Sequence, residues 1–243
     1  MNGITPDRIE DFYFSNPAER KTLELILSRQ MPFPFAGKSG ILLHGTWGTG
    51  KSTLAELLPE LIETAYSGSW NFANGVGQMA GPNPPEALKE IFRCGGGLNS
   101  TAFTKTINDC NSRNPFFSLS GHDYFIFDEV DRLTPGAQQS LRSTMGLKRC
   151  MFFFTTNYLP KIDPAIVNRC HLVEMNQAPN ATAYFPMAHS LLAQMGLAAS
   201  AIAPSMLQTY AKNAKGSLRD FLTDVLNEGL ALGGQIPITK GVV

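Results

Sequence analysis

A glycine-rich loop between a predicted strand and a predicted helix constrains the fold of this chain more than any other feature. The run Gly45–Ser52 reads GTWGTGKS and fits GxxxxGK[ST], and the apolar segment Gly40–His44 precedes it. From Thr53 onward the apolar residues have helical spacing. Glycines in such a loop turn backbone N–H groups toward a phosphate, and the helix amino terminus adds partial positive charge. The arrangement therefore predicts a phosphate-binding loop in an α/β domain.

The residues of this loop have separate expected roles. We expect Lys51 to reach the outer phosphates and the Ser52 hydroxyl to bind Mg²⁺. The other residues expected to contact the nucleotide are Gly45, Thr46, Trp47, Gly48, Thr49, Gly50 and Thr53. The sequence thus predicts that a nucleoside triphosphate is bound together with Mg²⁺, but the loop alone does not separate hydrolysis from binding.

A second apolar strand, residues 123–127, ends in the acidic pair Asp128 and Glu129. A carboxylate at this position can hold Mg²⁺ while its neighbour addresses the attacking water. We assign Asp128 to the metal and Glu129 to the general base or to positioning the attacking water, which favours hydrolysis. The alternative interpretation is an acidic turn that only closes the strand.

A third apolar strand runs into the polar residues Thr155, Thr156 and Asn157. In a parallel sheet this end lies beside the other carboxyl ends, where ligands bind. Asn157 could orient the attacking water, with Thr155 and Thr156 as competing candidates. The alternative is an Asn that only forms a turn.

Alternating strand and helix patterns predict an α/β fold with a parallel sheet covered by helices, followed by a small all-helical lid. The expected domains are residues 1–177 and 178–232, with a flexible tail at 233–243. The expected strands are 40–44, 70–73, 123–127 and 150–155, and the expected helices are 17–30, 52–66, 86–93, 102–111, 135–145, 164–169, 181–195, 204–215 and 217–230. Between residues 75 and 97, stretches rich in Gly or Pro indicate either a mobile functional loop or an irregular insertion.

Composition limits the possible partners and compartment. The 243 residues hold 20 basic and 20 acidic side chains, so any contact with nucleic acid must come from a local patch. Four widely spaced cysteines without CxxC pairs argue against structural zinc and favour buried thiols in a reducing compartment. Neither a signal core nor a membrane span is evident, so we expect a soluble, cytoplasmic protein.

Five sequence blocks, in order, resemble the AAA+ ATPases, and among them the clamp loader small subunits related to replication factor C. The blocks are Gly45–Ser52, Asp128–Thr134 with Ala137–Arg142, Thr155–Asn157, Asn168–Cys170 and Gly216–Asp220. The resemblance spans most of the chain. It implies an AAA+ core followed by a helical lid.

The resemblance also implies roles for individual residues. Asn157 is similar to the first sensor, and Arg169 to the arginine finger of the SRC motif, although Asn168 replaces the usual serine. This arginine would act on ATP bound by a neighbouring subunit. Arg219 is similar to the second sensor on the lid. For either arginine, a surface salt bridge is the alternative.

An aromatic residue near the amino terminus completes the expected nucleotide site. The segment Ile4–Phe14 is similar to the one that packs on adenine in this family, and Tyr13 and Phe14 are the expected neighbours of the base. An aromatic residue here could equally belong to the core.

The expected function is ATP hydrolysis in a ring or spiral formed by self-association or with related AAA+ subunits. Such an assembly would load or remodel a replication or recombination protein on DNA, such as a clamp, helicase or recombinase. The resemblance implies a collar domain after the lid, and we expect this chain to lack it. Candidates for contacts to the DNA backbone are Lys105, Arg113, Arg142 and Lys148. The alternative is a protein-remodelling chaperone, or an ATP-dependent switch, that acts on a protein partner without DNA.

Overall fold

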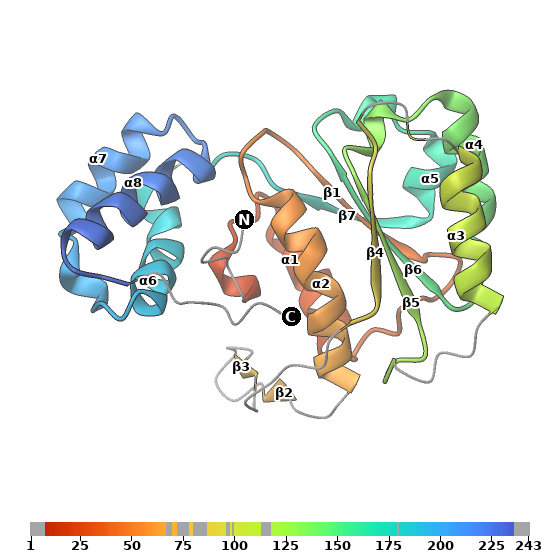
Figure 1. Cartoon of the computed structure of the whole chain (residues 1–243), viewed down its shortest axis with the longest axis horizontal. Helices are drawn as coiled ribbons and strands as arrows, with labels where there is room; N and C mark the ends of the chain where they lie inside the picture. The colour runs from red at the N-terminus through yellow and green to blue at the C-terminus, as the bar shows by residue number, and fades with distance from the viewer. Residues whose placement is uncertain are drawn as a thin grey trace. The chain divides into compact units, whose positions relative to one another are not determined.

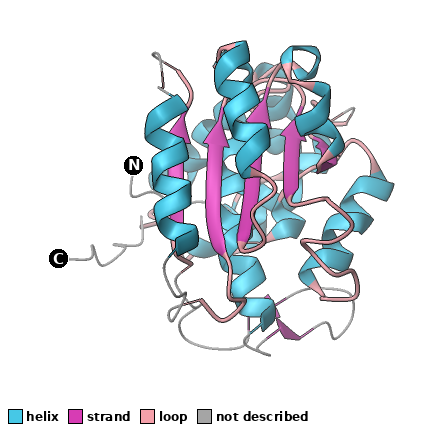
Figure 2. Ribbon diagram, turned by 90° about the vertical axis from the view of Figure 1, so that its right-hand side faces the viewer, coloured by secondary structure: helices cyan, strands magenta, loops and turns pink. Residues whose placement is uncertain are grey.

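A parallel β-sheet positions most of the predicted site residues. The computed structural model describes residues 8–66, 70–71, 78–79, 87–95, 98, 100–112, 118–178 and 180–235. The strands of the sheet follow the order β4-β5-β6-β1-β7, and every neighbouring pair is parallel (Figure 2). Their bounds are β1 Gly40–His44, β4 Lys89–Arg93, β5 Asp123–Asp128, β6 Cys150–Thr156 and β7 Cys170–Glu174. This confirms the predicted fold class.

Helices cover both faces of the sheet. Figure 1 shows α1 and α2 on one face and α3, α4 and α5 on the other. The helices are α1 Pro17–Leu27, α2 Lys51–Tyr66, α3 Ser100–Ser112, α4 Pro135–Thr144 and α5 Pro164–Asn168. Asn16, Thr134 and Asp163 cap α1, α4 and α5 through side-chain oxygens, so local sequence fixes where these helices begin.

Aromatic residues of the two central strands form the core beneath α3 and α4. Phe125 stacks on Phe152 with ring centroids 5.6 Å apart, and Phe127 lies 5.7 Å from Phe154. From α3, Phe103 meets Phe127 edge to face at 5.4 Å. Burial of each ring contributes about 1.5–3 kcal/mol. The uninterrupted apolar runs of β5 and β6 thus reflect strands that are buried on both faces.

Two predictions for the sheet need correction. A helix at residues 86–93 is wrong, because Lys89–Arg93 forms the edge strand β4, which pairs with β5 from Tyr124 to Asp128. Leu88, Lys89 and Glu90 favour a helix in isolation, but pairing with β5 overrides that preference. The strand β7 was missed, because His171 and Glu174 interrupt its apolar pattern.

The short strand expected at 70–73 is present at β2, Trp70–Asn71. It pairs antiparallel with β3, Gln78–Met79, in a separate two-stranded sheet. Most of the glycine-rich and proline-rich segment of residues 75–97, and the rest of the strand predicted to reach Ala73, lie outside the described residues.

The carboxyl-terminal part of the chain is helical. It contains α6 Phe185–Gln194, α7 Pro204–Asn213 and α8 Leu218–Ala231. Elsewhere along the described chain, as well as in this part, short 3₁₀ turns lie at Ile9–Asp11, Val130–Arg132, Leu159–Lys161, Ala181–Tyr184 and Ala199–Ala201. The Tyr184 ring packs on Phe221 at 5.6 Å, and Leu207 and Val225 are buried beside them. Among the described residues, no helix has the length and apolar character to cross a membrane.

Contacts group the chain into two compact units. One comprises the described parts of Met1–Ser15, Thr46–Leu54 and Asn176–Val243, and the other comprises Asn16–Gly45 and Ala55–Met175. The loop residues 46–54 therefore group with the carboxyl-terminal helices. The division at residue 177 stays a prediction.

Candidate functional site

Three glycines give the phosphate loop its backbone. Gly45, Gly48 and Gly50 have φ angles of 135°, 73° and 89°, which side-chain-bearing residues rarely adopt. Gly45 directly follows the last residue of β1, so the loop leaves the carboxyl edge of the sheet. The spacing of the glycines in the motif is thus a backbone requirement.

Lys51 is the first residue of α2 and is only 6% exposed. Its amine donates to the carbonyl of Thr46 and lies 3.4 Å from the hydroxyl of Thr49, which itself donates to the Thr46 carbonyl at 3.0 Å. The ammonium is therefore held inside the loop, where phosphate oxygens would be bound. Ser52 follows in the first turn of α2 and is exposed.

The amino terminus of α8 meets the phosphate loop. The Arg219 amide donates to the Gly48 carbonyl at 3.3 Å, and Ser217 caps the helix by accepting from the Asp220 amide. A Cβ at Gly48 would lie 2.9 Å from the Ser217 hydroxyl oxygen, so glycine permits this approach. The structure thus brings Arg219, the expected second sensor, to the loop that carries Lys51.

Two supports of the loop have no signature in the sequence. Asn176 accepts from the Thr46 amide at 3.1 Å, and its own amide donates to the Ser15 hydroxyl at 2.8 Å. The Phe12 ring, which is 3% exposed, would lie 3.1 Å from a Cβ at Gly50. Sequence reasoning missed both residues, because each acts across a long sequence separation.

Tyr13 follows Phe12 and is partly exposed, whereas Phe14 is buried. Both belong to the unit that includes the phosphate loop residues 46–54. The partial exposure leaves the Tyr13 ring accessible to a base. Its role beside adenine stays a prediction.

Thr155 joins the two acidic residues at the end of β5. Its hydroxyl donates to Asp128 Oδ1 at 2.6 Å and accepts from the Glu129 amide at 2.9 Å. Glu129 has the left-handed conformation φ 58°, ψ 50°, which is uncommon for a residue other than glycine. One hydroxyl therefore fixes both the Asp128 carboxylate and the backbone turn that directs Glu129.

The polar residues that end β6 divide into buried and accessible ones. Thr156 is fully buried and donates to Asp131 Oδ1 at 2.7 Å, while its hydroxyl accepts from the Tyr158 amide at 2.9 Å. Thr155 is buried and engaged as described above. Asn157 is the next residue and is partly exposed. Of the three candidates for the first sensor, Asn157 is thus the one whose side chain is open to a ligand.

Arg132 forms an ion pair with Glu129. Its Nε lies 2.8 Å from Glu129 Oε2, with the two side chains 58% and 38% exposed. A Cβ at Gly95 would lie 3.3 Å from the Arg132 guanidinium, so the backbone after β4 packs against the pair. Sequence reasoning gave Arg132 no role.

Cys94 lies beside the acidic cluster as a protonated thiol. Its amide donates to the Asp128 carbonyl at 3.0 Å. Burial, and then the carboxylates of Asp128, Asp131 and Glu129, raise the pKa of this thiol to about 12. Cys94, Cys150 and Cys170 are free and buried, whereas Cys110 is half-buried.

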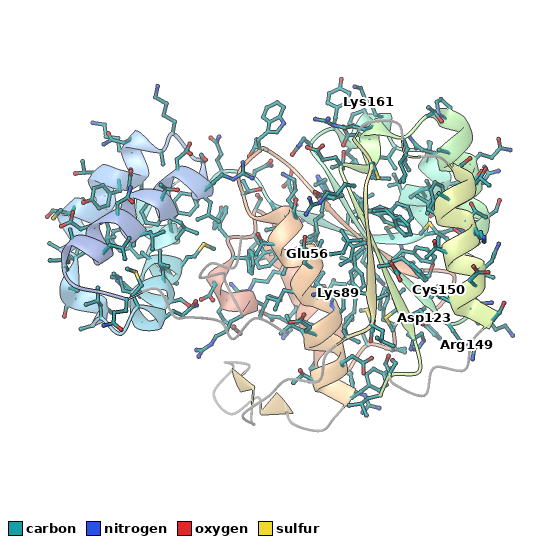
Figure 3. The ribbon with its side chains drawn as sticks, in the orientation of Figure 1. Glu56, Lys89, Asp123, Arg149, Cys150 and Lys161 are labelled. Carbon is teal, nitrogen blue, oxygen red and sulfur yellow. The ribbon has the colours of Figure 1, made fainter. Side chains whose placement is uncertain are left out.

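Arg169 lies at the amino end of β7, which is the end of the sheet opposite to Gly45 and Glu129. It caps α5 and directly precedes β7, and its guanidinium donates to the Ala165 carbonyl at 2.9 Å. Figure 3 marks the two edges, with Asp123 and Cys150 at the amino ends of β5 and β6 and Lys161 beyond the carboxyl end of β6. A five-residue strand such as β1 or β7 spans roughly 16 Å. Arg169 is therefore about a strand's length away from Gly45, and it is farther still from Glu129, because β5 lies two strands beyond β1.

The oxygen donors predicted to bind a metal have the chemistry that Mg²⁺ prefers. Ser52 supplies a hydroxyl and Asp128 a carboxylate, and Mg²⁺ typically takes one or two protein oxygens together with phosphate oxygens and water. Within the described parts of the chain, no group of three or more His, Cys, Asp or Glu side chains could hold a metal ion. The residues present thus suit a metal that arrives with a nucleotide.

Comparison with protein families identifies the class. Residues 41–177 match the AAA family, the ATPase family associated with various cellular activities. The matched region includes β1 from Ile41 onward, the phosphate loop, the acidic end of β5, Asn157 and Arg169. The chain therefore belongs to the AAA family of ATPases.

Individual relatives refine this placement. Replication factor C subunit 4 of Oryza sativa subsp. japonica is 24% identical over 174 residues, which are 71% of this chain and 44% of the relative. The replication factor C small subunit of Thermofilum pendens is 27% identical over 181 residues, which are 74% of this chain and 48% of the relative. The chain thus spans less than half the length of these relatives.

Among solved structures, PCH-2 of C. elegans superposes with a TM-score of 0.57 at 16% identity, over 92% of this chain and 69% of that chain. At this identity the likeness concerns the fold alone.

Proposed function

We propose that this chain hydrolyses ATP and that the phosphates bind at the Gly45–Ser52 loop. Lys51 would compensate the charge of the outer phosphates, since its ammonium is already held within the loop. Ser52 and Asp128 would hold Mg²⁺, which when bound neutralises phosphate charge. Glu129 would accept the proton of the attacking water, and Asn157 would orient that water.

The observation that most supports ATP hydrolysis, and not only ATP binding, is the fixed acidic turn after β5. The Thr155 hydroxyl ties the Asp128 carboxylate to the Glu129 amide, and Glu129 keeps a left-handed backbone. Residues outside the favoured backbone regions persist where the surroundings over-determine them, and they cluster at active sites. This fixed geometry at the end of β5 supports the assignment of Glu129 to the attacking water.

The Glu129→Gln variant tests this assignment. We expect ATP turnover to fall by at least about a hundredfold, because a general base contributes about 10²–10⁴ in rate. ATP affinity should stay within about twofold, since the amide keeps the size of the carboxylate. Turnover measured by phosphate release, with binding measured by calorimetry, separates the two. Unchanged turnover would remove Glu129 from the mechanism.

The two arginines would act from different chains. Arg219 would contact phosphate in its own chain, because its backbone already meets the phosphate loop. Arg169 would act on ATP held by a neighbouring subunit, which its position at the far edge of the sheet supports. Guanidinium groups suit this task because they stay charged and offer several donors. The chain would therefore assemble with further copies or with related AAA+ subunits.

We also propose that the assembly loads or remodels a protein on DNA, as in clamp loading. The support is the similarity to replication factor C subunits. Of the candidate phosphate contacts, Lys105 on α3 and Lys148 after α4 are exposed, whereas Arg142 lies 3.9 Å from Asp163 Oδ2. Arg113 lies outside the described residues.

Stimulation of ATP turnover distinguishes DNA from a protein client. We expect DNA to raise the turnover rate, and the stimulation to fall steeply between about 50 and 200 mM salt, because phosphate contacts release counterions. Lys105→Ala combined with Lys148→Ala should weaken DNA stimulation while leaving the basal rate unchanged. Stimulation by a protein alone, with none by DNA, would favour the chaperone or switch instead.

A further inference from the structure

The segment before β1 makes a tight turn that packs against the residues around Arg169. Phe35 and Lys38 exchange both backbone hydrogen bonds, at 3.0 and 2.9 Å, across Ala36 and Gly37. These two central residues have φ angles of 51° and 81°, as a type I′ turn requires. The Phe33 ring, just before the turn, meets His171 of β7 edge to face at 5.8 Å. The turn is therefore anchored on β7.

Lys38 reaches the backbone on both sides of Arg169. Its ammonium donates to the Asn168 carbonyl at 3.1 Å and to the Cys170 carbonyl at 2.6 Å. The amides of the next two residues, Ser39 and Gly40, both donate to the Arg169 carbonyl at 3.1 Å. Three consecutive carbonyls, one before, one at and one after Arg169, are thus held by three consecutive residues.

This contact also meets the end of a helix. Asn168 is the last residue of α5, and the carbonyls at a helix end lack partners within the helix and carry partial negative charge. An ammonium is a strong donor for such groups. Ser39 is itself fixed, because its hydroxyl donates to the Met145 carbonyl at 2.9 Å. The support for Arg169 therefore extends from the region after α4 through residues 38–40 to the end of α5.

Taken with these contacts, the geometry points to Lys38 as a positioning residue for Arg169. The Arg169 guanidinium is held by the Ala165 carbonyl, and its backbone is held by residues 38–40, so Lys38 determines where the side chain starts. This inference rests on the proposed function, in which Arg169 acts on the nucleotide of a neighbouring subunit. A finger that acts across an interface has to be positioned by its own chain before the neighbour arrives.

A double-mutant cycle tests the inference on the assembled protein. Lys38→Met removes the donor but keeps the length of the side chain, and we expect the maximal ATP turnover rate to fall about tenfold or more, because misplacing a catalytic group by 1 Å can cost about a hundredfold. The KM for ATP should change less than about twofold. Lys38→Arg, which keeps charge and donors, should recover most of the rate. Lys21→Met, the same change at an exposed lysine of α1, is the matched control and should match the unmodified protein.

The cycle separates a positioning role from a structural one. In an Arg169→Ala background, Lys38→Met should cause no further loss, because the group through which it acts is gone. A further loss equal to that of Lys38→Met alone would overturn the inference. The inference would also be overturned if Lys38→Met kept the turnover rate of the unmodified protein while Arg169→Ala lowered it.

Two further outcomes keep the test decisive. If Arg169→Ala alone keeps the turnover of the unmodified protein, the proposed finger fails, and the role of Lys38 fails with it. If Lys38→Met is insoluble, Lys38→Gln takes its place with the same expected order of rates.

Discussion

At the scale of single residues, one hydroxyl organises the acidic end of β5. Thr155 is 2% exposed, donates to Asp128 and accepts from the Glu129 amide, so it links the proposed metal ligand to the proposed base. The pattern of β6 indicated only a polar strand end, with Thr155 as a rival of Asn157. The structure instead gives Thr155 a supporting position behind the two carboxylates.

Thr155→Val tests this support. The substitution keeps the shape but leaves the Glu129 amide without its partner, so we expect a loss of about 1–3 kcal/mol in the free energy of unfolding. ATP turnover should also fall, because the left-handed turn at Glu129 loses its anchor. Thr155→Ser keeps the hydroxyl and is the control. Chemical denaturation and phosphate release measure the two effects, and equal values for the two variants would contradict this role.

At the scale of elements, a buried carboxylate fastens α2 to the turn before β5. Glu63 is 1% exposed, accepts from the Leu119 amide at 2.7 Å and the Ser118 hydroxyl at 2.8 Å, and also accepts from the Tyr124 hydroxyl. Burial alone would raise the pKa of Glu63, but the hydrogen bonds from Ser120, Tyr124, Ser118 and Leu119 together lower it. Burial and Glu63 raise the pKa of Tyr124.

The lowered pKa makes stability depend on pH in a defined direction. Because the folded protein binds this proton less tightly than the unfolded chain, the contribution is complete above the ordinary value of 4.5 and is lost as the pH falls through the folded value. Glu63→Gln should lower the free energy of unfolding at pH 7 by about 1.5–3 kcal/mol. The difference from the unmodified protein should shrink in acid. Denaturation curves across pH test this, with the exposed Glu90→Gln as control, and a difference independent of pH would contradict it.

A second tie between elements joins α2 to the edge of the sheet. Lys89 donates to Glu60 Oε1 at 2.6 Å and to the Glu56 carbonyl at 2.9 Å, and Figure 3 shows Glu56 and Lys89 close together. This contact helps to hold Lys89–Arg93 as a strand, although the residues at its start favour a helix in isolation. It joins Lys89 to residues 29 and 33 positions away in the sequence, so no local pattern could predict it.

At the scale of the whole molecule, local patterns predict what depends on local sequence. The buried strands β5 and β6 follow from their apolar runs, and the phosphate loop follows from its glycines and flanks. In contrast, His171 and Glu174 interrupt the apolar pattern of β7, so its pattern does not indicate a strand. Asn176 and Lys38 act through contacts with distant segments, so only the folded chain reveals them.

The sheet topology leads to the central claim, which is hydrolysis at an interface between chains. Asp128 and Glu129 lie at the carboxyl edge of the sheet, while Arg169 lies at the amino end of β7. Because β1 and β7 are parallel and in register, Arg169 lies at the opposite end of these strands from Gly45. The claim therefore concerns a site to which two chains contribute.

Mixing two inactive variants tests this claim most directly. Under the proposed roles, Arg169→Ala should keep its nucleotide site but lose the finger, and Lys51→Ala should lose phosphate binding but keep the finger. We predict that ATP turnover is low for each alone and rises in mixtures, with a maximum at intermediate ratios, because hybrid interfaces combine the intact halves. Turnover that stays at the level of the separate variants at every ratio, although the variants assemble together, would contradict the account.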